Sequence, residues 1–104
     1  MAQFDVHTNA SPSKDLVPYL LDVQSDLLSG LRTRVVIPLM KPATLGKQRI
    51  RDLHVEVTVQ GHRYVAVTSE LAGIAARNLG RKVGNLSAQR HAIVRAIDLI
   101  LSGV

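Results

Sequence analysis

The chain has 104 residues and no cysteine, which fits one domain over residues 1–104 and excludes disulfides, thiolate zinc sites and cysteine nucleophiles. Thirteen lysines and arginines against eight aspartates and glutamates give a net charge of +5, which favours a nucleic acid or an acidic protein as partner. No apolar run reaches the roughly 18 residues of a membrane span. The first residues also lack the pattern of a signal peptide, so we expect a cytoplasmic protein.

The first half of the chain predicts three strands. Residues 3–8 alternate between apolar and polar side chains, as a half-buried strand does. Residues 16–25 predict a second strand, in which Pro18 indicates a sheet edge or a bulge. Residues 32–39 are rich in β-branched side chains and predict the third. The intervening segments have the composition of a loop and a turn, at residues 9–13 and 26–30.

The middle of the chain predicts a β-hairpin. Residues 53–60 place Leu53 and three valines on one face and polar side chains, His54 among them, on the other. Gly61 provides a tight turn into residues 62–68. The following residues 69–85 are mixed in character, and we expect one short helical turn and one short strand there.

The last segment predicts a helix over residues 88–102. Ser87 is the expected N-cap, and Gly103 stands where a helix end often needs a left-handed residue. The polar side chains form one narrow stripe of His91, Arg95, Asp98 and Ser102. The remaining apolar arc is wider than one sheet face requires, so we expect this helix also to pack against a second copy of the chain. Strands followed by one helix, without βαβ alternation, indicate an α+β fold or a small barrel.

No motif of an enzyme or of a metal site is present. The sequence lacks the zinc-protease, nucleophile-elbow and phosphate-loop patterns, and its two glutamates lie on different predicted elements. His54 and His62 flank the predicted hairpin turn, but two histidines without a carboxylate make a poor zinc site. We therefore expect solvated strand histidines, no catalytic residue, no metal and no cofactor.

The charge pattern predicts a basic patch whose role the sequence does not decide. Arg32 and Arg34 share a strand face, and residues 41–51 contain four further cations and no acid. Contact with phosphates or an acidic peptide and an ordinary solvated face are equally consistent with this pattern. The chain has only three aromatic residues, which argues against a typical single-strand binder.

Four segments, in chain order, resemble the CcdB family of toxins. QFDV at residues 3–6 is similar to the Q-F-x-V opening of the family, and LDVQSDLL at residues 21–28 to its V-D-V-Q-S-D followed by two aliphatic residues. RVVIPL at residues 34–39 resembles R-x-V-I-P-L, and AIDL at residues 96–99 resembles A-I-N-L before a terminal Gly-Ile. The matches span the whole chain at spacings like those of the family.

The resemblance implies a mainly β member of the α+β class: a small SH3-like antiparallel barrel with one C-terminal helix, similar to CcdB, MazF and Kid, that forms a homodimer. It implies the toxin of a type II toxin–antitoxin module, which is not an enzyme. Such a toxin binds the A subunit of DNA gyrase and traps the complex in which DNA is cut. A CcdA-like antitoxin neutralises it through a disordered acidic segment that folds on binding. Neither a membrane nor sequence-specific nucleic-acid binding by the toxin alone is implied.

The resemblance also implies two binding sites. The family's gyrase contact centres on a final Trp-Gly-Ile, which corresponds here to Ser102, Gly103 and Val104 next to Leu101, so the tryptophan is absent. The implied antitoxin face consists of Gln3, Phe4, Ser25, Leu27, Leu28, Asp98 and Leu101. As neighbours at a strand end, one of Leu27 and Leu28 is expected in the core and the other exposed. Phe4 is also expected to be a core residue.

Two other functions stay open. Because Ser102 stands where the family has tryptophan, the chain is alternatively an antitoxin-binding dimer that no longer poisons gyrase. The third possibility is a MazF-like endoribonuclease on the same barrel fold, for which Arg34, His54 and His62 are the available catalytic groups.

Overall fold

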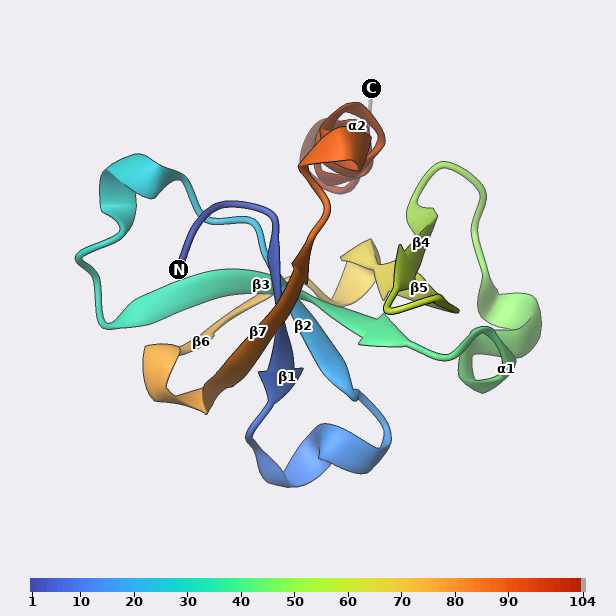
Figure 1. The fold of residues 1–104 in the computed structure, drawn as a ribbon. Coiled ribbons are helices and arrows are strands. Elements are labelled where there is room, and N and C mark those ends of the chain that lie inside the picture. The colour runs from blue at the N-terminus through green and yellow to red at the C-terminus, as the bar shows by residue number, and fades with distance from the viewer. Residues whose placement is uncertain (104) are drawn as a thin grey trace.

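The apolar runs of the chain pair into one curled antiparallel sheet in the computed structural model, which describes residues 1–103 (Figure 1). Its seven strands are β1 (Asp5–Asn9), β2 (Tyr19–Asp22), β3 (Thr33–Met40), β4 (His54–Val59), β5 (His62–Val67), β6 (Ala72–Ala75) and β7 (Leu79–Asn85). The helices are a single turn, α1 (Pro42–Leu45), and the longer α2 (Arg90–Ser102). The predicted architecture, a mainly β barrel-like sheet with a C-terminal helix, is confirmed.

The long strand β3 organises the sheet. The strand order is β4-β5-β3-β2-β1-β7, and β6 pairs with the first half of β3. Along β3, Thr33–Val36 pairs with β6, whereas its last residues, Leu39 and Met40, pair with β5. The sheet therefore splits around β3 and curls, which leaves an open end that α2 covers (Figure 1).

Two apolar clusters fill the two faces of the sheet. Neighbouring residues of one strand supply different clusters, as Leu20 and Leu21 or Val36 and Ile37 do, because successive side chains point to opposite faces. The larger cluster lies under α2 and consists of Phe4, Val6, Leu21, Val23, Ile37, Leu39, Val57, Val59, Tyr64, Ala66, Leu86 and Ile93. The smaller one consists of Val17, Leu20, Val36, Met40, Leu45, Val65, Val67 and Leu79.

The predicted strands match the structure except at their ends. The third strand and the hairpin are found, with Gln60 and Gly61 forming the turn at φ 51° and 82°. The second predicted strand, residues 16–25, is too long, because β2 covers only Tyr19–Asp22 and a 3₁₀ turn of residues Pro12–Asp15 precedes it. The prediction for residues 69–85 is also wrong in detail, since that segment forms two strands, β6 and β7.

The start of α2 differs from the prediction. Ser87 is not its N-cap: a 3₁₀ turn, Ser87–Gln89, precedes the helix, and the Oδ1 atom of Asn85 accepts a hydrogen bond from the Ser87 N–H at 2.8 Å. The Gln89 side chain donates to the Glu56 carbonyl at 3.0 Å and so ties the helix start to β4. At the other end, Gly103 adopts the predicted left-handed conformation, with φ 72°.

Candidate functional site

A 3₁₀ turn, η2 (Asp26–Leu28), lies beside the N-terminus of the chain (Figure 1). The Ser25 Oγ atom accepts a hydrogen bond from the Leu27 N–H at 3.2 Å, which shapes the turn. Gln3 is bound to the same segment, because its N–H donates to Asp26 Oδ1 at 2.8 Å and its Nε2 donates to the Val23 carbonyl at 3.1 Å. The structure thus brings together the Gln3 and Ser25 portions of the predicted antitoxin face.

Three leucines project from this region into solvent. The exposed fractions of Leu27, Leu28 and Leu31 are 94, 51 and 52%. The expectation that one of Leu27 and Leu28 is buried is wrong, because they lie in a 3₁₀ turn rather than at a strand end. Sequence reasoning missed Leu31, although an apolar residue directly after the Ser29-Gly30 turn was a usable signal. We call these three residues the leucine patch.

Phe4 does not belong to that exposed surface. It is buried in the larger apolar cluster, as expected of a core residue, and it has a positive φ of 70° that redirects the chain into β1. The Arg90 guanidinium lies over its ring, 5.7 Å from the centroid, so Phe4 connects the N-terminal segment to the first turn of α2. Phe4 therefore offers almost no surface of its own to a partner.

The C-terminal turn of α2 is the second exposed site. Leu101 is 75% exposed, and Asp98, one turn earlier, lies on the same helix face. The Ser102 hydroxyl donates to the Asp98 carbonyl at 2.7 Å and so is occupied within its own helix. Val104, the last residue of the predicted gyrase contact, lies outside the described residues. Within residues 1–103, no hydrogen bond or ion pair joins this turn to η2.

Helix α2 has more apolar surface than the sheet covers. Only Ile93 and Ala96 are buried. Val94, Ile100 and Leu101 are exposed apolar residues on the same helix. The wide apolar arc predicted from the sequence is therefore present, and part of it faces solvent within this chain.

His54 is buried, contrary to the expectation of a solvated strand histidine. Its Nδ1 accepts from the Ile50 N–H at 2.8 Å, so in the neutral ring Nε2 bears the proton and donates to Ser69 Oγ at 3.1 Å. Burial first and the nearby Arg49 second lower the pKa of His54, while Glu70 acts in the opposite direction. These bonds join the loop before β4 to the 3₁₀ turn Thr68–Glu70 that follows β5.

The three candidate ribonuclease groups do not converge. In the hairpin register His54 pairs with Val67 and His62 with Val59, so the two histidines lie at opposite ends of a pair of strands roughly 16 Å long. Arg34 is only 1% exposed, and its guanidinium binds the buried carboxylate of Asp22. Because it is buried, Arg34 is not part of the predicted basic surface patch either.

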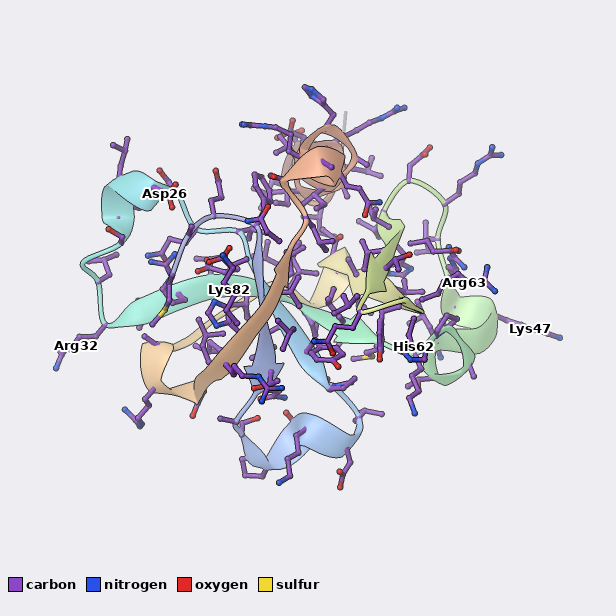
Figure 2. The ribbon with its side chains drawn as sticks, viewed as in Figure 1. Asp26, Arg32, Lys47, His62, Arg63 and Lys82 are labelled. Carbon is purple, nitrogen blue, oxygen red and sulfur yellow. The ribbon has the colours of Figure 1, made fainter. Side chains whose placement is uncertain are left out.

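Apart from Arg34, the predicted basic patch is divided between two sides of the molecule. Figure 2 shows Arg32 near η2, whereas Lys47, His62 and Arg63 lie on the side that bears α1. Arg49 and Arg63 both contact Glu56, at 2.9 and 3.4 Å. The Arg49 hydrogen bond is the main cause that lowers the pKa of the Glu56 carboxyl. The predicted basic patch is therefore partly neutralised.

Comparison with known proteins gives a family and a fold. The family model described as CcdB protein matches residues 3–103. Among solved structures, the Mycobacterium tuberculosis toxin MazF-mt6 superimposes with a TM-score of 0.73 at 20% identity, covering 92% of this chain and 94% of that one. An endoribonuclease from a mycobacterial species, solved with its cognate antitoxin, gives 0.75 at 15% identity, covering 97% and 94%. At these identities the two structures establish the fold alone. No helix among the described residues is long and apolar enough to cross a membrane.

Proposed function

The chain belongs to the CcdB family of toxin–antitoxin toxins, and from this we propose that it binds the A subunit of DNA gyrase and traps the complex in which DNA is cut. It acts by binding, in the cytoplasm, and a CcdA-like antitoxin neutralises it. The observation that carries the gyrase proposal is the exposed turn at the end of α2, which presents an apolar Leu101 next to the left-handed Gly103.

The gyrase contact differs from that of the family in its anchor. Ser102 replaces the tryptophan, and its hydroxyl is already bonded to the Asp98 carbonyl. The apolar area for the contact must then come from Leu101 and Val104. Because buried apolar anchors dominate protein interfaces, we expect Leu101 to account for much of the affinity.

The test is a DNA cleavage assay. The purified protein is incubated with gyrase from its own host, ATP and supercoiled plasmid, and the mixture is then denatured. Linear DNA is expected with the wild type and not with Leu101→Asp. Leu16→Asp is the matched control, since Leu16 is also an exposed leucine but lies far along the chain from α2. A folded wild-type protein that yields no linear DNA contradicts the proposal.

For the antitoxin we propose a docking site on the leucine patch. An acidic segment that folds on binding needs apolar anchors as well as opposite charge. This region offers both, because Arg32 directly follows Leu31 in the chain and the net charge is +5. In a calorimetric titration with the acidic segment of the cognate antitoxin, Leu27→Asp is expected to abolish binding. Leu16→Asp is again expected to bind like the wild type, and equal binding by Leu27→Asp would contradict this site.

We also propose a homodimer in which the exposed apolar residues of α2 are covered by the second copy. Val94 and Ile100 lie outside the leucine patch, and 39% and 42% of their surface stays exposed to solvent. Light scattering at micromolar concentration should give twice the chain mass, and Ile100→Asp should shift it toward the monomer. A monomeric wild type would contradict this.

Two alternatives have a specific observation in their favour. The absence of tryptophan at Ser102 favours a dimer that binds antitoxin but no longer poisons gyrase, and in that case Ser102→Trp should strengthen gyrase binding. RNA cleavage has only the fold shared with a mycobacterial endoribonuclease in its favour, because its three candidate groups do not converge. Intact RNA after long incubation with the purified protein would exclude the second.

A further inference from the structure

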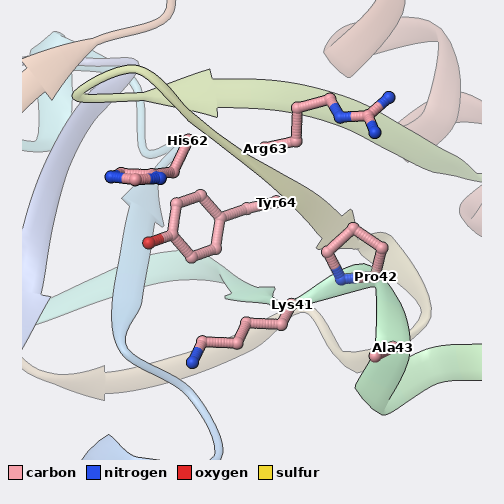
Figure 3. A pocket seen from close by; sticks show the side chains of 6 residues that line it. All are labelled: Lys41, Pro42, Ala43, His62, Arg63 and Tyr64. Carbon is pink, nitrogen blue, oxygen red and sulfur yellow. The ribbon is translucent and has the colours of Figure 1, made fainter.

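A hollow of about 420 Å³ opens on the α1 side of the molecule (Figure 3). Lys41 and the start of α1 form one wall, and the start of β5 forms the other. None of the residues that line it is acidic: they are Lys41, Pro42, Ala43, His62, Arg63 and Tyr64. The hollow is wide open to solvent rather than enclosed, so a ligand in it would keep one side in water.

Three hydrogen-bond donors of different kinds lie at one side of this hollow. Figure 3 shows the Lys41 ammonium, the His62 ring and the Tyr64 hydroxyl on the same side, as expected for His62 and Tyr64, which are two residues apart on one strand. Arg63 points away from them and contacts Glu56 at 3.4 Å. Lys41 is therefore the cation that the hollow offers to a ligand.

Tyr64 is held rigidly. Its ring is buried and stands edge-on to Tyr19, with the two centroids 5.1 Å apart and the planes at 89°. Burial first and the neighbouring Tyr19 second raise the pKa of Tyr64. His62, by contrast, is exposed and presents a free ring at the mouth of the hollow.

A cation, a hydroxyl and an exposed ring around one hollow suit a nucleotide better than an acidic peptide. The carboxylates of an acidic peptide would use the cation but neither the volume nor the exposed ring. A nucleotide uses all of them, because its phosphate accepts hydrogen bonds from Lys41 and Tyr64, and its base has a face on which the His62 ring can stack.

We propose that this hollow binds one nucleotide of a single-stranded nucleic acid without regard to sequence, with Lys41 and the Tyr64 hydroxyl on the phosphate and the His62 ring against the base. This site is separate from both the leucine patch and the end of α2. Its test needs neither gyrase nor antitoxin, so it stands or fails independently of the toxin function.

The experiment measures binding of a short fluorescent oligothymidylate by anisotropy at several salt concentrations. Removing one phosphate contact in Lys41→Gln should weaken binding several-fold and lower the slope of log K against log salt by about one. The matched control is Lys14→Gln, which removes the same charge from an exposed lysine that does not line the hollow. It should bind almost as the wild type does. Equal losses in the two variants would indicate diffuse charge attraction and overturn the proposal.

The role of the ring is tested separately. His62→Ala should weaken binding several-fold, and His62→Phe, which keeps a flat ring without donors, should recover most of the affinity. Equally weak binding by both would overturn the stacking contact. Nuclear magnetic resonance titrations compare the oligonucleotide with inorganic phosphate and with a polyglutamate peptide. Larger shifts at residues 41 and 62–64 with the oligonucleotide support the site, whereas equal or larger shifts with the peptide or with phosphate overturn it as a nucleotide site.

Discussion

Arg34 Nε and Nη2 both donate to Asp22 Oδ2, at 2.9 and 2.6 Å, and both side chains are almost completely buried. Asp22 Oδ1 in turn accepts from the Gln24 N–H at 3.0 Å. This ion pair joins β2 to β3 through residues of two of the four segments that resemble the CcdB family. Arg32, which directly precedes β3, and Arg34, which lies within it, therefore have different roles, since Arg32 is exposed and Arg34 is structural.

Removing one partner of this ion pair should be far more harmful than removing both. Arg34→Met leaves the Asp22 carboxylate buried without a counter-charge, which costs about 3–5 kcal/mol of the free energy of unfolding. The double variant Asp22→Leu/Arg34→Met should cost clearly less than the sum of the two single changes. Urea unfolding of the four proteins measures this, and additive losses would show that the pair is not coupled.

Protonation of His54 should destabilise the protein as the pH falls. Its pKa in the folded state is lowered from the ordinary 6.5, mainly by burial. As the pH falls through about 6.5, the unfolded chain binds a proton that the folded protein does not, so the free energy of unfolding decreases until the folded-state pKa is reached. A proton on Nδ1 also breaks the hydrogen bond from the Ile50 N–H.

The measurement compares urea unfolding at pH 7 and pH 5 for the wild type and His54→Gln. Both proteins keep the other three histidines, whose contributions therefore cancel. The wild type should lose more stability between the two pH values than the variant does. An equal loss would mean that His54 does not control this pH range.

Gly80 is required by a close approach of β7 to β1. A Cβ atom at this position would collide with Thr8 Oγ1 and lie 3.0 Å from the Thr8 carbonyl oxygen. The same Oγ1 accepts from the Arg81 N–H at 3.0 Å, where the pairing of the two strands is irregular. Gly80→Ala should therefore destabilise the protein by about 1–3 kcal/mol, measured by thermal unfolding.

Gly84 provides the matched control for that change. It lies on the same strand, and a Cβ atom there meets nothing within 4 Å. Gly84→Ala should change the stability by less than about 0.5 kcal/mol. If both alanine variants behaved alike, the effect would come from glycine in a strand rather than from the contact with Thr8.

If the proposed function is correct, Gly103 should affect gyrase binding through its own left-handed backbone conformation. Its φ of 72° costs alanine about 1 kcal/mol, whereas asparagine tolerates that conformation. Gly103→Ala should weaken binding to the gyrase A subunit roughly fivefold, and Gly103→Asn should weaken it less. Surface plasmon resonance measures both. The same loss in both variants would point to the side chain rather than to the backbone.

Local patterns in the sequence determined the elements whose side chains have a regular period. The alternation in the hairpin and the β-branched run of the third strand predicted β4, β5 and β3, and Gly103 predicted the left-handed end of α2. The four matching segments predicted the family, because each retains several residue types in order. These features depend on neighbouring residues, so one chain is enough to predict them.

Only the tertiary structure decided where the polar side chains go. Arg34 and His54 look like surface residues in an alternating strand, yet both are buried, because their partners Asp22 and Ser69 come from other strands and loops. Leu27 and Leu28 look like a strand end, yet the Ser25 hydroxyl and the Gln3 backbone hold them in an exposed turn. Burial and hydrogen bonding depend on which distant segments meet, and the local period of a sequence does not contain that information.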